Sequence, residues 1–123
     1  MEVGLMVNRM SAVPERARHE LATQWQAARV LFVEAPERAV QRADELARTA
    51  LEEAGYAVEG PAAPPYDNMV LAYRAAHGIA RLSARGGATR RDLAHAMVHF
   101  GALIADLIGE PAADEPISRD RSR

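Results

Sequence analysis

Two histidines of this chain, His95 and His99, stand four residues apart, a spacing that places both on one face of a predicted helix. Two imidazoles at this spacing can hold one metal ion. Asp92 and Asp106 lie near the same face. That face points away from the apolar stripe of its helix, and a working site needs a third ligand from elsewhere in the chain. We therefore predict surface histidines, no metal site and no cofactor.

A third histidine, His77, lies near the middle of another predicted helix. Its position resembles the phosphoacceptor of histidine phosphotransfer domains, which also carry an exposed histidine on a four-helix bundle. Those domains have a lysine soon after the histidine, whereas Ala80 and Arg81 follow here; arginine can pair with phosphoryl oxygens in its place. The alternative, which we favour, is a boundary histidine bonded to a neighbouring carboxylate.

The third and fourth predicted helices carry a concentration of basic side chains: Arg74, Arg81, Arg85, Arg90 and Arg91. Arg81 and Arg85 are four residues apart and repel each other unless an anion sits nearby. The anion could be Glu45, Glu52 or Glu53 of the preceding helix, or a nucleic acid. Nucleic-acid binding is the weaker alternative, because base-reading side chains are missing from the cluster and the net charge is −2.

The chain lacks the residues that other reaction chemistries require. The chain has no cysteine, which excludes disulfides, thiolate metal sites and a cysteine nucleophile. No serine lies near a plausible histidine–acid pair, and Gly86-Gly87 is typical of a turn rather than of a phosphate-binding loop. We predict that the protein is not an enzyme.

Apolar residues recur at intervals of three and four in four segments, which predicts four helices and an all-α fold. The segments run from Glu15 to Val33, from Pro36 to about Gly55, from Tyr66 to Arg85, and from Thr89 to Gly109. They form a four-helix bundle made of two helical hairpins, separated by the proline-rich linker at residues 60–65. The predicted core is Trp25, Phe32, Val40, Leu51, Leu71, Ile79, Leu93, Phe100 and Ile104.

The predicted organisation is an N-terminal arm (residues 1–13), one four-helix domain (residues 14–109) and a disordered C-terminal tail (residues 110–123). The first residues lack the pattern of a signal peptide, and no apolar run approaches the length of a membrane span. We therefore expect a cytoplasmic protein that does not associate with membranes.

The third predicted helix is apolar over more than half of its circumference, and such a helix is either central in a fold or carries a partner on its second face. Val30 and Val33 also lie outside the main stripe of the first helix. This surplus predicts a helical protein–protein interaction module, either binding a protein partner or self-associating as a homodimer. The predicted partner-binding residues are Val30, Val33, Leu71, Arg74, Arg81 and Arg85.

Two groups of residues carry a family resemblance. The first consists of Trp25, Phe32-Val33-Glu34-Ala35-Pro36, Ala39-Val40, Ala43-Asp44 and Leu46. The second consists of Tyr73-Arg74, His77, Ala88-Thr89, Asp92-Leu93, Ala96 and Phe100. Together they resemble a family of small, uncharacterised helical proteins of actinobacteria. The chain departs from that family at Glu34-Ala35, where two acidic residues are usual, and at Phe100-Gly101, where a Tyr-Arg pair is common. The resemblance implies a helical fold and an actinobacterial origin and assigns no functional residue.

Overall fold

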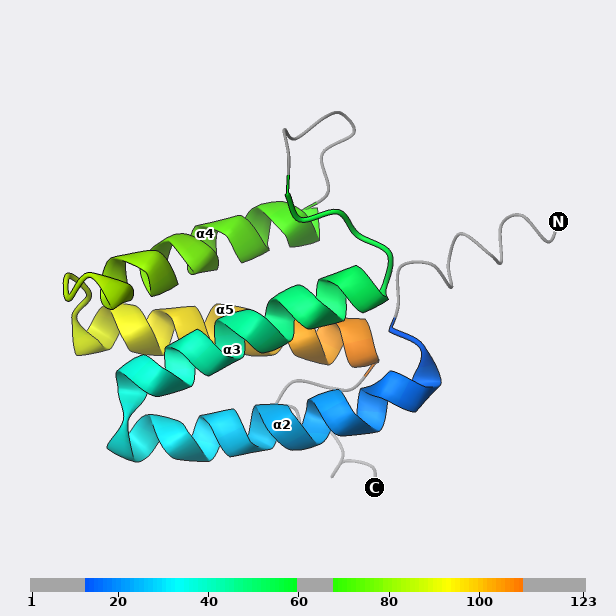
Figure 1. Ribbon diagram of the computed structural model, residues 1–123, viewed down its shortest axis with the longest axis horizontal. Helices are drawn as coiled ribbons and strands as arrows, with labels where there is room; N and C mark the ends of the chain where they lie inside the picture. The colour runs from blue at the N-terminus through cyan, green and yellow to red at the C-terminus, as the bar shows by residue number, and fades with distance from the viewer. Residues whose placement is uncertain (1–12, 60–67, 110–123) are drawn as a thin grey trace, which may run out of the picture.

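The computed structural model describes residues 13–59 and 68–109. This part of the chain forms four helices and no strand (Figure 1). They are α2 (Glu15–Glu34), α3 (Pro36–Glu53), α4 (Asn68–Ala84) and α5 (Arg90–Ile108). The predicted all-α, four-helix architecture is confirmed, with successive helices running in opposite directions (Figure 1).

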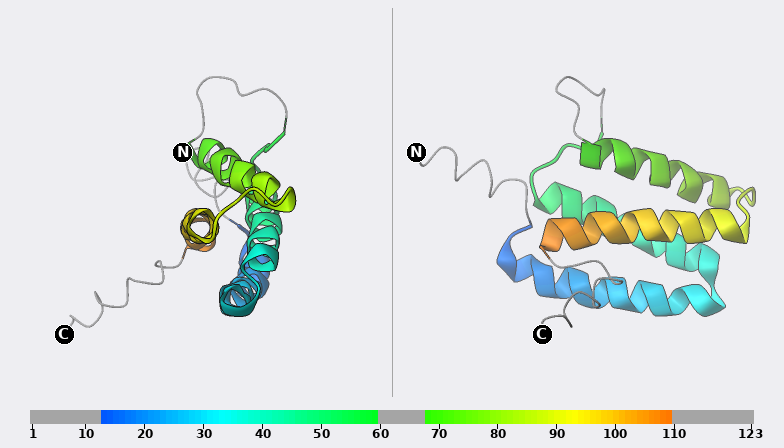
Figure 2. Two further views of the ribbon diagram at one scale, coloured as in Figure 1. Left: turned by 90° about the vertical axis from the view of Figure 1, so that its left-hand side faces the viewer. Right: turned by 180° about the vertical axis from the view of Figure 1, so that it is seen from behind.

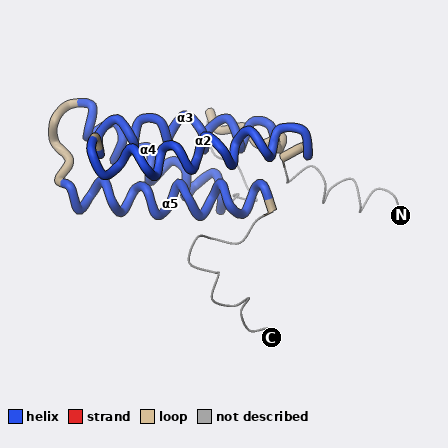
Figure 3. The backbone as a smooth tube through the Cα atoms, turned by 90° about the horizontal axis from the view of Figure 1, so that it is seen from below, coloured by secondary structure: helices blue, strands red, loops and turns tan. Residues whose placement is uncertain are grey.

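The four helices do not form a square. α3 and α5 pack against each other and against both other helices, whereas α2 and α4 do not touch each other anywhere in the described residues. The left view of Figure 2 looks along the helices and shows α4, α3 and α2 in a row with α5 on one side of it; Figure 3 shows the same arrangement from below. The cross-section is therefore a rhombus in which α3 and α5 form the short diagonal and α2 and α4 the two far corners.

Local sequence signals fix where the helices begin and end. Pro36 occupies the first turn of α3, where its missing N–H costs nothing, and Ala35 alone separates α2 from α3. Thr89 caps α5: its side chain accepts a hydrogen bond from Asp92 N at 3.0 Å, and the Asp92 carboxylate accepts one from Thr89 N at 2.9 Å. Gly109 ends α5 in the left-handed conformation that glycine adopts most readily.

Small side chains make up much of the core on α3 and α4, and most of the large ones lie on α5. Val40, Ala43 and Ala47 are completely buried on α3 and let its neighbours approach closely, while Tyr73 and Phe100 are the largest of the fully buried side chains. Of the predicted core, five residues are buried: Val40, Leu51, Leu93, Phe100 and Ile104. Trp25, Phe32 and Ile79 are partly buried and pack against that core.

The prediction was wrong for Leu71, which is 41% exposed. Leu71 lies on the side of α4 opposite Tyr73, Ala76 and Ala80, which are buried. Since α4 occupies a far corner of the rhombus, only one side of it can face the core.

Several predicted features lie outside the described residues: most of the N-terminal arm, the linker at 60–65 and the tail at 110–123. Val13, which the prediction assigned to the arm, belongs to the fold, because it is buried and its N–H donates to the Leu107 carbonyl at 3.1 Å. None of the helices described is both long and apolar enough to cross a membrane.

Candidate functional site

The predicted partner-binding residues fall on two separate faces of the molecule. Leu71, Arg81 and Arg85 belong to the α4 side, and Val30 and Val33 belong to α2. The structure does not bring the two groups into contact, because α2 and α4 do not touch each other in the described residues (Figure 2).

The outer face of α4 carries an exposed apolar stripe. Leu71 is 41% exposed and Leu82 is 39% exposed. Ala75 and Gly78 stand between them and are exposed as well. The intervals of four, three and four residues keep these side chains in line along the helix. We call this stripe of Leu71, Ala75, Gly78 and Leu82 the α4 seam.

The basic residues beside the seam differ in their surroundings. Arg74 is half-buried and donates to the Val58 carbonyl from Nε at 3.3 Å and from Nη2 at 3.1 Å, so it ties α4 to the segment that follows α3. Arg81 stands two turns further on and is exposed, as is Arg85. Neither Arg81 nor Arg85 lies within 4.0 Å of a carboxylate in the described part of the chain.

Carboxylates of α3 were one expected source of neutralisation for these arginines, but two of the three expected carboxylates pair with other residues. Glu45 pairs with Arg42 at 3.0 Å. Glu52 pairs with Arg48 at 3.4 Å. The positive charge beside the α4 seam therefore stays uncompensated within residues 13–59 and 68–109.

Arg90, another member of the predicted basic concentration, contacts an aromatic ring of α2. The Arg90 guanidinium lies 5.2 Å from the centre of the Phe32 ring, a cation–π contact that directs it toward α2. Nucleic-acid binding by the basic residues stays a prediction.

The second exposed face lies on α2 and α5. Val30 is 73% exposed, Val33 is 72% exposed and Val98 on α5 is 68% exposed. The sequence analysis identified the first two and missed Val98, whose signal was its position away from the apolar stripe of α5. We call Val30, Val33 and Val98 the valine face.

His77 is the boundary histidine bonded to a carboxylate that the sequence favoured. Its Nδ1 lies 2.8 Å from Asp44 Oδ2 on α3, and its ring stacks on Tyr73, with the ring centres 5.4 Å apart and the planes inclined by 21°. Since a carboxylate can only accept, Nδ1 carries the proton of this bond. Nε2 forms no hydrogen bond with any described residue, and the side chain is half-buried.

Two members of this cluster were missed by the sequence analysis. Asp44 is only 9% exposed, and its Oδ1 has no hydrogen-bond partner in the described structure. Burial, and after it the Asp44 carboxylate, raises the pKa of Tyr73 above its usual value, while the nearby Arg48 guanidinium acts in the opposite direction. The signal for Asp44 was its place on the apolar stripe of α3, four residues after Val40.

His95 and His99 are both exposed, and their ring centres lie 4.6 Å apart. The described residues contain no group of three or more histidine, aspartate or glutamate side chains placed to hold a metal ion. The Asp92 carboxylate is occupied by the cap at Thr89, whose hydrogen bonds lower its pKa.

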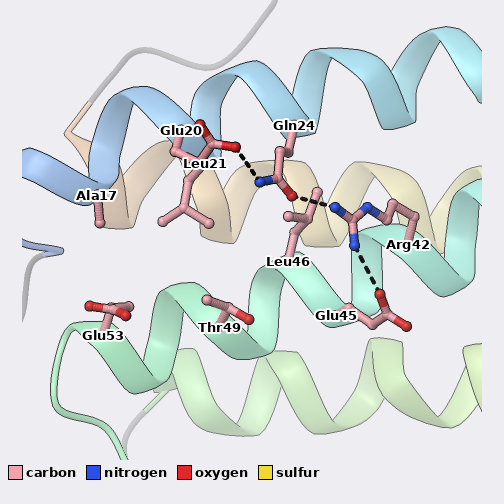
Figure 4. Close-up of a pocket in the computed structure, with 9 residues that line it drawn as sticks. All are labelled: Ala17, Glu20, Leu21, Gln24, Arg42, Glu45, Leu46, Thr49 and Glu53. Carbon is pink, nitrogen blue, oxygen red and sulfur yellow. Dashed lines mark hydrogen bonds and ion pairs between the residues drawn. The ribbon is translucent and has the colours of Figure 1, made fainter.

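A groove of about 440 Å³ runs between α2 and α3 (Figure 4). Its polar side chains bond to one another: Gln24 donates to Glu20 at 2.6 Å, and Arg42 donates to both Gln24 and Glu45. Leu21 and Leu46 also line the groove. These bonds join α2 to α3 at the surface, and the groove contains no nucleophile–base pair.

Comparisons with known proteins leave the chain without a family assignment, and the actinobacterial resemblance stays a prediction. No protein-family model matches the chain, and no curated protein and no solved structure is significantly similar to it.

Proposed function

We propose that this protein is a non-catalytic helical interaction module that self-associates through the valine face. The observation that carries the proposal is the exposure of three valines on two adjacent helices, each with more than two thirds of its surface accessible. Single exposed apolar residues are common on protein surfaces, whereas grouped ones mark contact sites.

Each of these exposed valines lowers the stability of the helix that contains it. A β-branched side chain lowers helix stability by about 0.5 kcal/mol relative to alanine. Because the three side chains are exposed, packing within the domain does not compensate for this loss. Burial in an interface would compensate for it.

The three valines lie on two helices, α2 and α5, that pack against each other. Trp25 packs where a side chain on Gly101 would stand, and Phe32 receives Arg90. Val30 and Val33 lie on α2 between or next to Trp25 and Phe32, and Val98 lies on α5 between Arg90 and Gly101. The valine face therefore includes exposed positions of both helices of this pair.

A second copy of the chain is the partner that this face fits best. A two-fold axis pairs the face with itself, and uncharged valines meet without repulsion. Complete burial of three valines from each copy yields on the order of 9–18 kcal/mol. Because association costs roughly 4–15 kcal/mol, the net affinity is modest.

Sedimentation equilibrium of the purified full chain tests this proposal. We expect wild type to dimerise with increasing concentration, and Val30→Arg and Val98→Arg each to weaken dimerisation at least about tenfold, which corresponds to 1.4 kcal/mol. Ala84→Arg introduces the same charge at an exposed position of α4, a helix outside the valine face, and should leave the dimer intact; circular dichroism checks that each variant is folded. A wild type that stays monomeric throughout, or an equal loss in Ala84→Arg, overturns the proposal.

The Asp44–His77 bond supports phosphoacceptance as a second candidate function. With Nδ1 held by Asp44, Nε2 remains available to attack the phosphorus of an aspartyl phosphate on a receiver domain. The N–P bond would form as the acyl O–P bond breaks and the receiver carboxylate leaves, and Arg81 lies one turn away to pair with phosphoryl oxygens.

Incubation with a panel of phosphorylated receiver domains tests this candidate. We expect label on the wild-type chain and none on His77→Gln, with His99→Gln as the exposed control. Absence of His77-dependent label across the panel removes the candidate and leaves the interaction module unaffected.

A further inference from the structure

We propose that the α4 seam is a docking surface for an acidic amphipathic helix of another protein. This inference concerns a different face from the valine face and does not depend on self-association. It rests on three features of the seam. Gly78 at its middle is not required by the described fold, its apolar residues have the spacing of a helix contact, and Arg81 and Arg85 beside it have no carboxylate partner in the described residues.

Gly78 has no explanation inside the domain. A glycine in the middle of a helix costs about 1 kcal/mol relative to alanine. A side chain is excluded at Gly101, because a Cβ there would lie 2.6 Å from Trp25 Cζ2. At Gly78 a Cβ would meet no atom of the described residues within 4 Å, so the described part of the fold does not require the glycine. The absence of a side chain at Gly78 leaves space on the outer face of α4.

The spacing of the seam is that of a helix that receives another helix. Intervals of four, three and four residues are those of the contact positions of a coiled coil. Leu71 and Leu82 stand at the two ends, and Ala75 and Gly78 occupy the middle. A partner helix can approach α4 most closely at the middle, and large apolar side chains of the partner would fill the space over Gly78.

Charge selects the partner. Arg81 and Arg85 stand beside and at the end of the seam and are uncompensated in the described structure. Pairing α4 with α4 of a second copy would add the arginines of one copy to those of the other, and like charges across a helix pair are unfavourable. Glutamate or aspartate flanking an apolar stripe would neutralise them. The fitting occupant is therefore an acidic amphipathic helix rather than a second copy.

A synthetic peptide of four heptads serves as the probe, with leucine at the a and d positions and glutamate at e and g. Its glutamates prevent pairing with itself at neutral pH. We expect saturable binding to the full chain, measured by fluorescence anisotropy of a labelled peptide at low salt. Binding should weaken as salt rises, because exposed charge pairs are screened. A peptide with lysine in place of glutamate should not bind.

Variants test the contribution of the arginine charges and that of Gly78 separately. The double variant Arg81→Glu and Arg85→Glu should lose at least tenfold in affinity for the glutamate peptide and gain binding of the lysine peptide. Gly78→Gln should lose a similar factor while unfolding at no lower a temperature than wild type, and Ala27→Gln, an exposed change on α2, should bind like wild type. Val30→Arg should also bind like wild type, which keeps this test independent of dimerisation.

Three outcomes overturn the inference. The glutamate peptide may fail to saturate, the lysine peptide may bind wild type equally well, or a stably folded Gly78→Gln may bind like wild type. Titration with a labelled DNA duplex completes the test. Salt-sensitive binding of the duplex that disappears in the arginine double variant, without binding of the peptide, assigns the arginines to nucleic acid and removes the helix from the proposal.

Discussion

The same substitution, glycine to alanine, should have opposite effects at two positions of this protein. Gly78 on α4 and Gly101 on α5 both lie inside helices, where alanine is favoured by about 1 kcal/mol. At Gly78 the added methyl group meets nothing within 4 Å. At Gly101 it would lie 2.6 Å from Cζ2 and 3.2 Å from Cη2 of Trp25, far inside van der Waals contact.

The expected magnitudes follow from these surroundings. Gly78→Ala should raise the free energy of unfolding by about 0.5–1 kcal/mol. Gly101→Ala gains the same helix propensity but forces the Trp25 ring to move, and overpacking of this kind costs about 1–3 kcal/mol. The net effect at Gly101 is a loss of up to about 2 kcal/mol. A domain of this size changes its melting temperature by about 4–8 °C for each kcal/mol.

Thermal and urea unfolding followed by circular dichroism measure both changes. Trp25 is the only tryptophan of the chain, so its fluorescence reports directly on the α2–α5 contact. We expect a red shift of emission in Gly101→Ala, as the half-buried ring becomes more exposed, and an unchanged spectrum in Gly78→Ala. Equal stabilisation by both substitutions, with the same Trp25 emission, would refute the packing of Trp25 on Gly101.

Two further predictions concern the capping box and the buried tyrosine. Thr89→Ala removes the N-cap of α5 and should destabilise the domain by about 1 kcal/mol in urea unfolding, whereas Thr49→Ala, at an exposed position inside α3, should be neutral or slightly stabilising; equal effects of the two would contradict the role of the cap. Tyr73 holds its proton more tightly in the folded chain than an unfolded tyrosine, whose pKa is about 10, so its contribution to stability is present below about pH 10 and is lost as the pH rises further. Tyr73→Phe should reduce the alkaline loss of stability measured by urea unfolding, and an unchanged pH profile in Tyr73→Phe would contradict the assignment.

Helix positions could be predicted from the sequence because their signals are local. Pro36, Thr89 and Gly109 each act on the backbone within a few residues, and the four helices begin and end within a few residues of their predicted limits. The core residues of α3 and α5 were also predicted largely correctly. These two helices form the short diagonal, so the apolar stripe of each meets neighbours on both sides.

The place of each helix in the cross-section could not be predicted in this way. The sequence showed that the third helix is apolar over most of its surface, which fits a central helix or a helix with an external partner. α4 lies at a far corner, and therefore Leu71 is exposed rather than buried. The same limit explains the missed Asp44–His77 bond, because it joins residues 33 positions apart on two helices whose contact depends on the whole packing.

Polar bonds rather than apolar burial determine which side of α4 faces the core. The hydrophobic effect is non-directional, so a helix apolar over most of its circumference could bury Leu71 and Leu82 as readily as Ala76 and Ala80. Three bonds remove this freedom. Asp44 binds His77 at 2.8 Å, Gln41 donates to the Ala80 carbonyl at 2.9 Å, and Arg74 donates to the carbonyl of Val58 at 3.1 Å.

All three bonds join one side of α4 to α3 and the segment after it. A buried carboxylate such as Asp44, with one oxygen lacking a partner in the described structure, is expensive if its bond to His77 is broken. Rotation of α4 that buried its seam would break that bond, and the cost of the unpaired Asp44 would offset the gain from burying two leucines. The buried polar cluster thus keeps the apolar seam at the surface, where it is available to a partner helix.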